Sequence, residues 1–198
     1  MEKILYIHGY NSTPNSNTFN LLRNNLDKSK YELQAIDYDA EDPEGAIRRI
    51  RKYASDNKID LVIGSSLGGF ITLHLYGMSR IAINPCWDPA VELPKIGYTG
   101  PTEPYARLLK ELRESSDEEE AGLCSGCFAE DDELLGTKYR DIFSRYYLRV
   151  YAIPGGHRVS EEAAALLATE IIPDHDAETN DFVYKLINAD NLPWLDEL

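Results

Sequence analysis

The chain has 198 residues, of which 43% are hydrophobic, and its formal net charge at pH 7 is −14. A chain of this length and apolar content is expected to fold as one domain with a sizeable core. The negative charge repels phosphate groups, so it argues against nucleic acid as a partner and gives no attraction to an anionic membrane surface.

The first half of the chain alternates short apolar runs with segments of helical periodicity. Strands are predicted at residues 3–7, 31–39, 60–64 and 80–86, and helices at residues 19–29, 43–57 and 68–78. The segment that follows, residues 87–105, holds four prolines and two glycines. We expect this segment to be irregular and long enough to lie over a site.

The second half continues the same alternation. A helix is predicted at residues 105–120, ending in an acidic, solvated stretch, followed by a strand at 122–132, a helix at 134–147, a strand at 148–157 and a helix at 161–172. Strands that are separated by helical crossovers pair in parallel. The sequence therefore predicts an α/β fold with a single, mostly parallel sheet of about six strands, helices on both faces and little or no lid.

The expected domain covers residues 1–172, and residues 173–198 are expected to form an acidic C-terminal tail or extension. In that tail we expect Asp174, His175 and Asp176 to be solvated. No segment approaches the ~20 apolar residues that span a bilayer, and the N-terminus lacks the pattern of a cleavable signal. Three cysteines argue against a disulfide framework, so the prediction is a cytoplasmic protein.

Gly64-Ser65-Ser66-Leu67-Gly68 fits the pattern G-x-S-x-G, with a predicted strand before it and a predicted helix after it. In this motif the serine sits on a sharp strand-to-helix turn that exposes its hydroxyl at the sheet edge. The helix that follows directs backbone N–H groups and the positive end of its dipole toward the same point. The pattern indicates Ser66 as a nucleophile, although the motif alone also suits an ordinary glycine-rich turn.

A nucleophilic serine needs a base, and the chain has four histidines. His157 closes the loop after a predicted strand, at the edge of the sheet where Ser66 is expected. His8 is interpreted as a structural brace and His74 as a histidine of the core. His157 is therefore the predicted base.

A carboxylate should orient that histidine, and in this fold it lies between the serine and the histidine in the chain. The strand at residues 122–132 ends in an acidic run in which Asp132 and Asp131 both fit. Asp132 is preferred because it begins the loop and two leucines follow shortly after it; Glu130 and Glu133 are weaker choices. For the oxyanion, the predicted donors are the backbone N–H groups of Tyr10 and Leu67.

These stretches resemble the small single-domain YqiA-type esterases of the α/β-hydrolase superfamily. The resemblance rests on "ILYIHGYNSTPNS", "GSSLGG", "AINPC", "AEDDELL" and "GGHRVSEE". The order and spacing of these stretches cover roughly residues 3–172. It implies an ester or thioester hydrolase with Ser66 as nucleophile, Asp132 as acid and His157 as base.

The expected protein is thus a serine hydrolase that acts on a small carboxylic ester or thioester, without a metal or organic cofactor. An acyltransferase or peptidase could use the same three residues, and a non-catalytic binding protein of this fold is the alternative from another class.

Trp87, with Tyr98 and Tyr105, is a candidate to line an acyl pocket, and packing is an equally good role for all three. Cys124 and Cys127 have C-x-x-C spacing, but their place inside a predicted strand argues against a redox pair.

Overall fold

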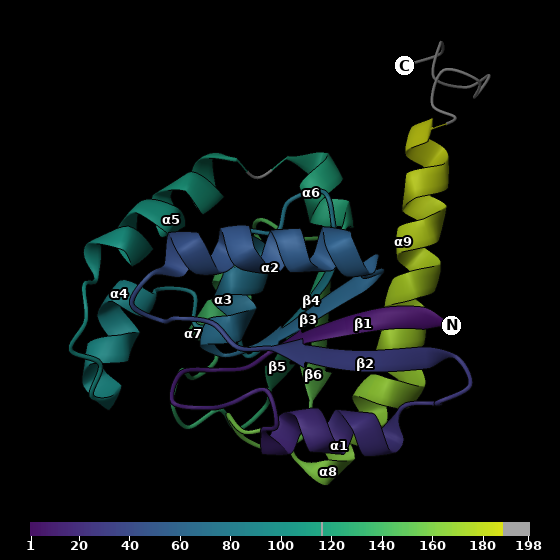
Figure 1. Ribbon diagram of the computed structural model, residues 1–198, viewed down its shortest axis with the longest axis horizontal. Coiled ribbons are helices and arrows are strands. Elements are labelled where there is room, and N and C mark those ends of the chain that lie inside the picture. The colour runs from purple at the N-terminus through teal and green to yellow at the C-terminus, as the bar shows by residue number, and fades with distance from the viewer. Residues whose placement is uncertain (116, 188–198) are drawn as a thin grey trace.

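The computed structural model describes residues 1–115 and 117–187, and its centre is a single sheet of six parallel strands (Figure 1). In spatial order the strands are β2 (Tyr31–Ile36), β1 (Glu2–Ile7), β3 (Leu61–Ser65), β4 (Ser79–Ile83), β5 (Cys124–Ala129) and β6 (Arg149–Ile153). The predicted sheet of about six mostly parallel strands is confirmed. Parallel pairing brings the carboxyl ends of all six strands to one edge.

Helices cover both faces of the sheet (Figure 1). On one face lie α1 (Asn17–Asn25), α8 (Glu161–Leu166) and a π-helical turn, η2 (Leu167–Ile171); on the other lie α2 (Pro43–Asn57), α3 (Leu67–Leu73), α5 (Glu103–Glu114) and α7 (Lys138–Phe143). Each layer encloses its own apolar core. In β1, for example, Leu5 and Ile7 face the core under α2 and α3, whereas Ile4 and Tyr6 face the other.

The central strands β1 and β3 read as nearly continuous apolar runs because both of their faces are buried. The edge strands β2 and β6 are only partly buried. Helix α2 occupies the predicted residues 43–57, and local signals set both of its ends. The Asp42 side chain caps it by accepting a hydrogen bond from the Gly45 N–H, and Pro43 occupies its first position. It ends at Lys58, which has a left-handed backbone conformation.

Two predictions about elements were wrong. Residues 87–105 are not irregular throughout, because they include α4 (Pro89–Glu92) and a 3-10 turn, η1 (Leu93–Ile96). Pro89 begins α4 and Pro94 is the second residue of η1, and proline suits the first turn of a helix. The predicted helix at 105–120 is instead two, α5 and α6 (Glu118–Gly122), and α6 begins at a cap in which the Asp117 side chain accepts from the Glu120 N–H.

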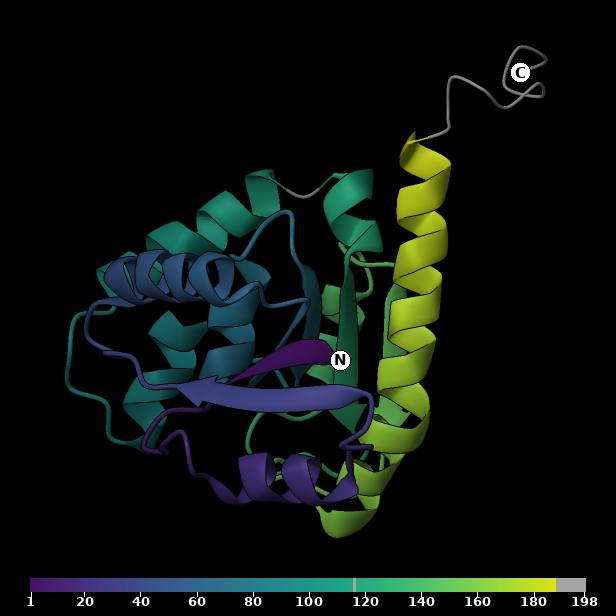
Figure 2. The ribbon, with the colours of Figure 1, turned by 45° about the vertical axis from the view of Figure 1, so that its right-hand side comes forward.

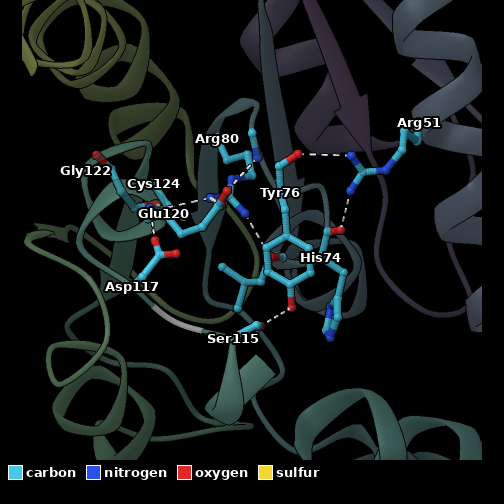
Figure 3. A network of polar contacts seen from close by, with 12 residues as sticks. Arg51, His74, Tyr76, Arg80, Ser115, Asp117, Glu120, Gly122 and Cys124 are labelled. Carbon is cyan, nitrogen blue, oxygen red and sulfur yellow. Dashed lines mark hydrogen bonds and ion pairs between the residues drawn. The ribbon is translucent and has the colours of Figure 1, made fainter. Parts of the chain in front are cut away.

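The expectation that this acidic stretch is solvated holds for Asp117, Glu118 and Glu119, which are exposed, but it was wrong for Glu120. Glu120 forms an ion pair with Arg80, a fully buried residue of β4 (Figure 3). Arg80 also donates to the carbonyl oxygen of Leu73 at 2.9 Å, and Glu120 accepts from the Gly77 N–H at 2.7 Å. The pair therefore fixes the turn between α3 and β4.

Replacing Glu120 with Gln is expected to lower the free energy of unfolding by about 3–5 kcal/mol, because it leaves a buried guanidinium without its counter-charge. The measurement is urea unfolding followed by circular dichroism. The matched control is Glu119→Gln, an exposed glutamate of the same helix, which should change stability by less than about 0.5 kcal/mol. Equal effects in the two variants would contradict the role given to this ion pair.

The chain continues past residue 172 as helix α9 (Ile172–Ile187), which runs beside the strands (Figure 2). The expectation that His175 is solvated was wrong, because the residue is fully buried between Ser79 Oγ at 2.8 Å and Ser125 Oγ at 2.7 Å. Burial, with help from Arg149 and Arg80, lowers the pKa of His175 to about 3, so the ring is neutral near pH 7. Residues 188–198 of the expected tail lie outside the described residues.

No helix in the described part of the chain combines the length and the apolar character needed to cross a lipid bilayer.

Candidate active site

Ser66 lies between the end of β3 and the start of α3, at the carboxyl edge of the sheet. Its backbone has φ 54° and ψ −118°, a conformation that side-chain-bearing residues rarely adopt. Three backbone hydrogen bonds hold it there: its N–H donates to Ile83 O, and its carbonyl oxygen accepts from the N–H groups of Phe70 and Cys86. The strained turn exposes the hydroxyl, as the G-x-S-x-G pattern predicts.

Glycines make this turn possible because backbone from other segments lies against it. A Cβ atom at Gly64 would lie 2.2 Å from the carbonyl oxygen of Gly68, and one at Gly68 would lie 2.2 Å from that of Ile7. Both distances are far inside van der Waals contact, so neither position admits a side chain without movement of the backbone. The turn is thereby packed directly onto the end of β1.

The His157 ring lies between Ser66 and Asp132. Its Nδ1 is 2.9 Å from Asp132 Oδ2, and its Nε2 is 3.0 Å from Ser66 Oγ. A carboxylate can only accept, so Nδ1 carries the ring proton of the neutral imidazole and Nε2 is free to accept from the serine hydroxyl. The His157 and Asp132 side chains are only 10% and 4% exposed. Water therefore has little access to the bond between them.

The Asp132 carboxylate is held by the loop that follows β5. Its Oδ1 accepts from the backbone N–H groups of Leu134 at 2.9 Å and Leu135 at 2.8 Å. Burial acts to raise the pKa of this carboxyl, but the hydrogen bonds from His157 and from the Leu135 and Leu134 N–H groups outweigh it and keep the pKa below its usual value. The group is therefore an anion at neutral pH.

The other carboxylates of the acidic run are placed differently. Asp131 is exposed, and its backbone N–H donates to Gly155 O at 3.0 Å. Glu133 reaches the same loop as the histidine but binds its backbone, since Glu133 Oε2 accepts from the His157 N–H at 2.8 Å. Within the described residues, Asp132 is the carboxylate that meets the ring of His157.

The loop after β1 borders the serine from the other side. A Cβ atom built on Gly9 would lie 3.1 Å from Ser66 Cβ and 3.6 Å from Ser66 Oγ, so this backbone passes directly beside the hydroxyl. Tyr10 follows Gly9, and Leu67 occupies the first position of α3, where a backbone N–H has no partner within the helix. Hydrogen bonds from these two N–H groups to an oxyanion stay a prediction.

The remaining histidines near the sheet have other partners. His8 Nε2 is 3.0 Å from Asp37 Oδ1, the ring stacks on Tyr38, and the Tyr38 hydroxyl donates to His8 O at 2.9 Å. These contacts agree with a brace for the loop before Gly9. His74 is buried in the core, as predicted, with its ring nitrogens 2.9 and 3.0 Å from two backbone carbonyl oxygens.

Trp87 is fully buried rather than exposed at the site. Its ring packs against Phe143 and Tyr146, and Tyr98 and Tyr105 are buried in the same core. A substrate would have to displace some of these aromatic side chains to reach Trp87. In this conformation Trp87 is therefore not directly accessible to a substrate. Substrate binding by Trp87 stays a prediction.

Cys124 and Cys127 lie on opposite faces of β5, one in each core, and form no disulfide. In residues 1–115 and 117–187, no three His, Cys, Asp or Glu side chains are grouped as metal ligands.

Two residues next to the site were missed by sequence reasoning. For Glu133 the sequence suggested only a weak alternative to Asp132 as the acid. For Asn84, in the stretch "AINPC", it predicted no role. The available signal for Asn84 was a polar residue that directly follows the apolar run Ile81-Ala82-Ile83, at the carboxyl end of a central strand.

The sheet order and the strand–turn–helix around Ser66 define the fold of the α/β-hydrolases, and comparison with solved structures agrees. Est1E from Butyrivibrio proteoclasticus superposes with a TM-score of 0.62 at 11% identity, over 94% of this chain and 88% of its own. The esterase domain of a Rhodothermus marinus protein gives 0.64 at 14% identity, over 87% and 84%. Mouse alpha/beta hydrolase domain-containing protein 10 gives 0.62 at 18% identity, over 89% and 90%.

The chain belongs to the family described as "Uncharacterised protein family (UPF0227)", whose model matches residues 3–127. This match confirms the resemblance to the YqiA-type group that the motifs indicated. None of the curated proteins compared with the chain matches it. The matched region includes Ser66 and ends before Asp132 and His157, so the case for these two residues rests on their geometry.

Proposed function

We propose that this protein is a serine hydrolase that cleaves a small carboxylic ester or thioester through an acyl-enzyme. The observation that carries the proposal is the continuous chain of hydrogen bonds from Ser66 through His157 to Asp132. A serine hydroxyl becomes a strong nucleophile only when a base accepts its proton. Here the base is in contact with the hydroxyl, and a buried carboxylate fixes its tautomer.

In the first half of the reaction, Ser66 Oγ attacks the carbonyl carbon of the substrate while His157 Nε2 accepts the hydroxyl proton. The backbone N–H groups of Tyr10 and Leu67 donate to the oxyanion that forms. The bond from carbon to the leaving oxygen or sulfur then breaks, and His157 returns the proton to the departing alcohol or thiol. Asp132 stabilises the imidazolium while it exists and does not itself take the proton.

In the second half, a water molecule attacks the acyl-enzyme. His157 Nε2 accepts a proton from that water, and the same two N–H groups hold the second oxyanion. When the bond to Ser66 Oγ breaks, His157 gives the proton back to the serine. The products are a carboxylic acid and the free enzyme, so the cycle needs no other reactant than water.

Two further observations bear on the substrate. The segment between β4 and α5 is occupied by the short helices α4 and η1, which leaves little chain for a lid. This favours small substrates over bulky lipids. Among the similar structures, the Rhodothermus marinus domain is an esterase domain, and Est1E binds ferulic acid. An esterase domain agrees with an ester as the substrate class, and a bound carboxylic acid is of the class that ester hydrolysis releases.

The test is hydrolysis of p-nitrophenyl esters from acetyl to palmitoyl, and of matched thioesters, together with labelling by a fluorophosphonate. Wild type should hydrolyse the shorter chains best and carry the label on Ser66. Ser66→Ala should lose both turnover and label. The matched control is Ser65→Ala, which removes the neighbouring serine, whose hydroxyl bonds the Tyr6 hydroxyl at 2.7 Å instead.

The outcomes separate the alternatives. Labelling of Ser66 without hydrolysis of any ester would indicate the acyltransferase or peptidase alternative, in which the same serine transfers to another acceptor or cleaves an amide. The absence of both labelling and hydrolysis would contradict the proposal and favour a non-catalytic binding protein.

A further inference from the structure

Asn84 lies immediately after β4 and is only 2% exposed, yet all of its side-chain polar atoms are used. Its Oδ1 accepts from the Ala129 N–H at 2.7 Å, at the end of β5. Its Nδ2 donates to the carbonyl oxygens of His157 at 3.0 Å and Gly156 at 3.4 Å. One side chain thus joins the strand that leads to Asp132 to the loop that carries His157.

The backbone of His157 is held on both sides. Its N–H donates to Glu133 Oε2, and its carbonyl oxygen accepts from Asn84. With the ring bonded to Asp132 and Ser66, every polar group of His157 has a partner. A flexible loop would leave the ring free to rotate or withdraw, whereas these bonds fix the atoms from which the ring projects.

The backbone at Asn84 carries a second sign of constraint. Its φ is 43°, although Asn84 precedes Pro85, and a residue before proline normally adopts an extended conformation. Asparagine tolerates positive φ better than most residues that have a side chain. It also supplies an acceptor and two donors from one short amide. Strained conformations that the surroundings hold in place gather at functional sites.

We infer that Asn84 is a positioning residue of the proposed hydrolase, which holds His157 at hydrogen-bonding distance from Ser66 and Asp132 by clamping the His157 carbonyl to the end of β5. The inference rests on the proposed function. Asn84 touches neither the hydroxyl nor the imidazole, so it acts through the loop.

Two variants test the clamp kinetically. Asn84→Gly accepts the positive φ and removes all three bonds, and Asn84→Asp keeps the size and the acceptor but turns a carboxylate toward two carbonyl oxygens. Both should lower kcat by about 10- to 100-fold, because a small misplacement of the base is enough for such a loss. KM should change little, since Asn84 does not contact the substrate. Rates for Asn84→Asp are taken on the alkaline side of the pH profile, where the carboxyl is ionised.

The matched control is Ile81→Val, which removes one methylene from a fully buried residue of β4, the strand that Asn84 follows. This variant should lower the thermal unfolding midpoint and keep kcat. A fall in kcat in the Asn84 variants can then be separated from an effect of lower stability alone. If the Asn84→Asp variant kept the kcat of wild type, packing alone would be sufficient to position His157, and the inference would be overturned. A fall in kcat for Asn84→Gly that is no larger than the fall for Ile81→Val would also overturn the inference.

A readout independent of turnover is the proton between His157 Nδ1 and Asp132, followed by proton NMR as a low-field resonance that His157→Ala removes. Wild type and Ile81→Val should keep this resonance, and Asn84→Gly should broaden or lose it through exchange with water. If wild type hydrolysed no ester but the resonance still depended on Asn84, the proposed function would fail and the positioning would stand. If the esters were hydrolysed and the resonance survived in Asn84→Gly, the positioning would fail alone.

Discussion

Alanine in place of Ser66 or His157 is expected to lower kcat by about 10⁴- to 10⁶-fold, and the double variant should be no worse than the more damaged single variant. The two side chains work as one unit, because the serine is a weak nucleophile without the base and the base has no task without the serine. KM for a p-nitrophenyl ester should change little, since neither change removes the surface that binds the acyl chain. The measurement is steady-state hydrolysis by the three variants and wild type.

Ser65→Ala and urea unfolding of each variant serve as controls for damage to the turn. The result that contradicts the assignment is a His157→Ala enzyme with near-normal turnover. A double variant whose loss is the product of the two single losses would also contradict it, because independent effects multiply and a shared step does not.

The sequence predicted the strands and their parallel pairing well, because most strands are short apolar runs between turn residues and β2 alternates polar and apolar positions. Helix α2 was predicted to the residue, since Asp42 and Pro43 mark its start. The helix after residue 172 was harder to find. Four of its sixteen residues are acidic, and one face buries His175 and Thr179 while Asp174 remains exposed. Helical spacing of the few buried positions was the available signal, and the surrounding charges obscured it.

The serine and the histidine were predictable because each stands at the carboxyl end of a strand, in a motif with its own physical reason. The choice of Asp132 over Asp131 depended on one residue of register in a loop, which spacing alone does not set. In the structure, hydrogen bonds from Leu134 and Leu135 turn the Asp132 carboxylate toward the ring. Such backbone contacts leave no pattern in the sequence.

Asn84 was missed for a related reason. Its role depends on two backbone groups, Ala129 N–H and His157 O, that lie 45 and 73 residues away in the chain. Backbone groups are the same for every residue type, so no motif records them. Four described residues other than glycine have positive φ. Lys58 ends α2, and the other three, Asn11, Ser66 and Asn84, lie in the loops at the carboxyl edge of the sheet. Strain at this edge therefore marks the same place as the motifs.

Asp132→Asn is expected to lower kcat by about 10⁴-fold while the fold and KM stay close to wild type. An amide in this position presents an N–H₂ group to His157 Nδ1, which favours the tautomer with the proton on Nε2. That nitrogen would then donate to Ser66 Oγ instead of accepting from it, so the base would be present but unable to act. The measurement is ester hydrolysis near pH 7.5, with unfolding curves to show that stability is retained.

The matched control for this prediction is Asp131→Asn, a change of the same size at the exposed neighbouring carboxylate. Because surface substitutions usually alter free energies by less than about 0.5 kcal/mol, kcat should stay within roughly twofold of wild type. If Asp131→Asn instead gave the large loss and Asp132→Asn did not, the loop would have to rearrange on substrate binding to bring Asp131 to the ring. That single comparison decides which carboxylate orients the base, because both variants remove one charge from the same loop and differ only in whether the group meets His157 Nδ1.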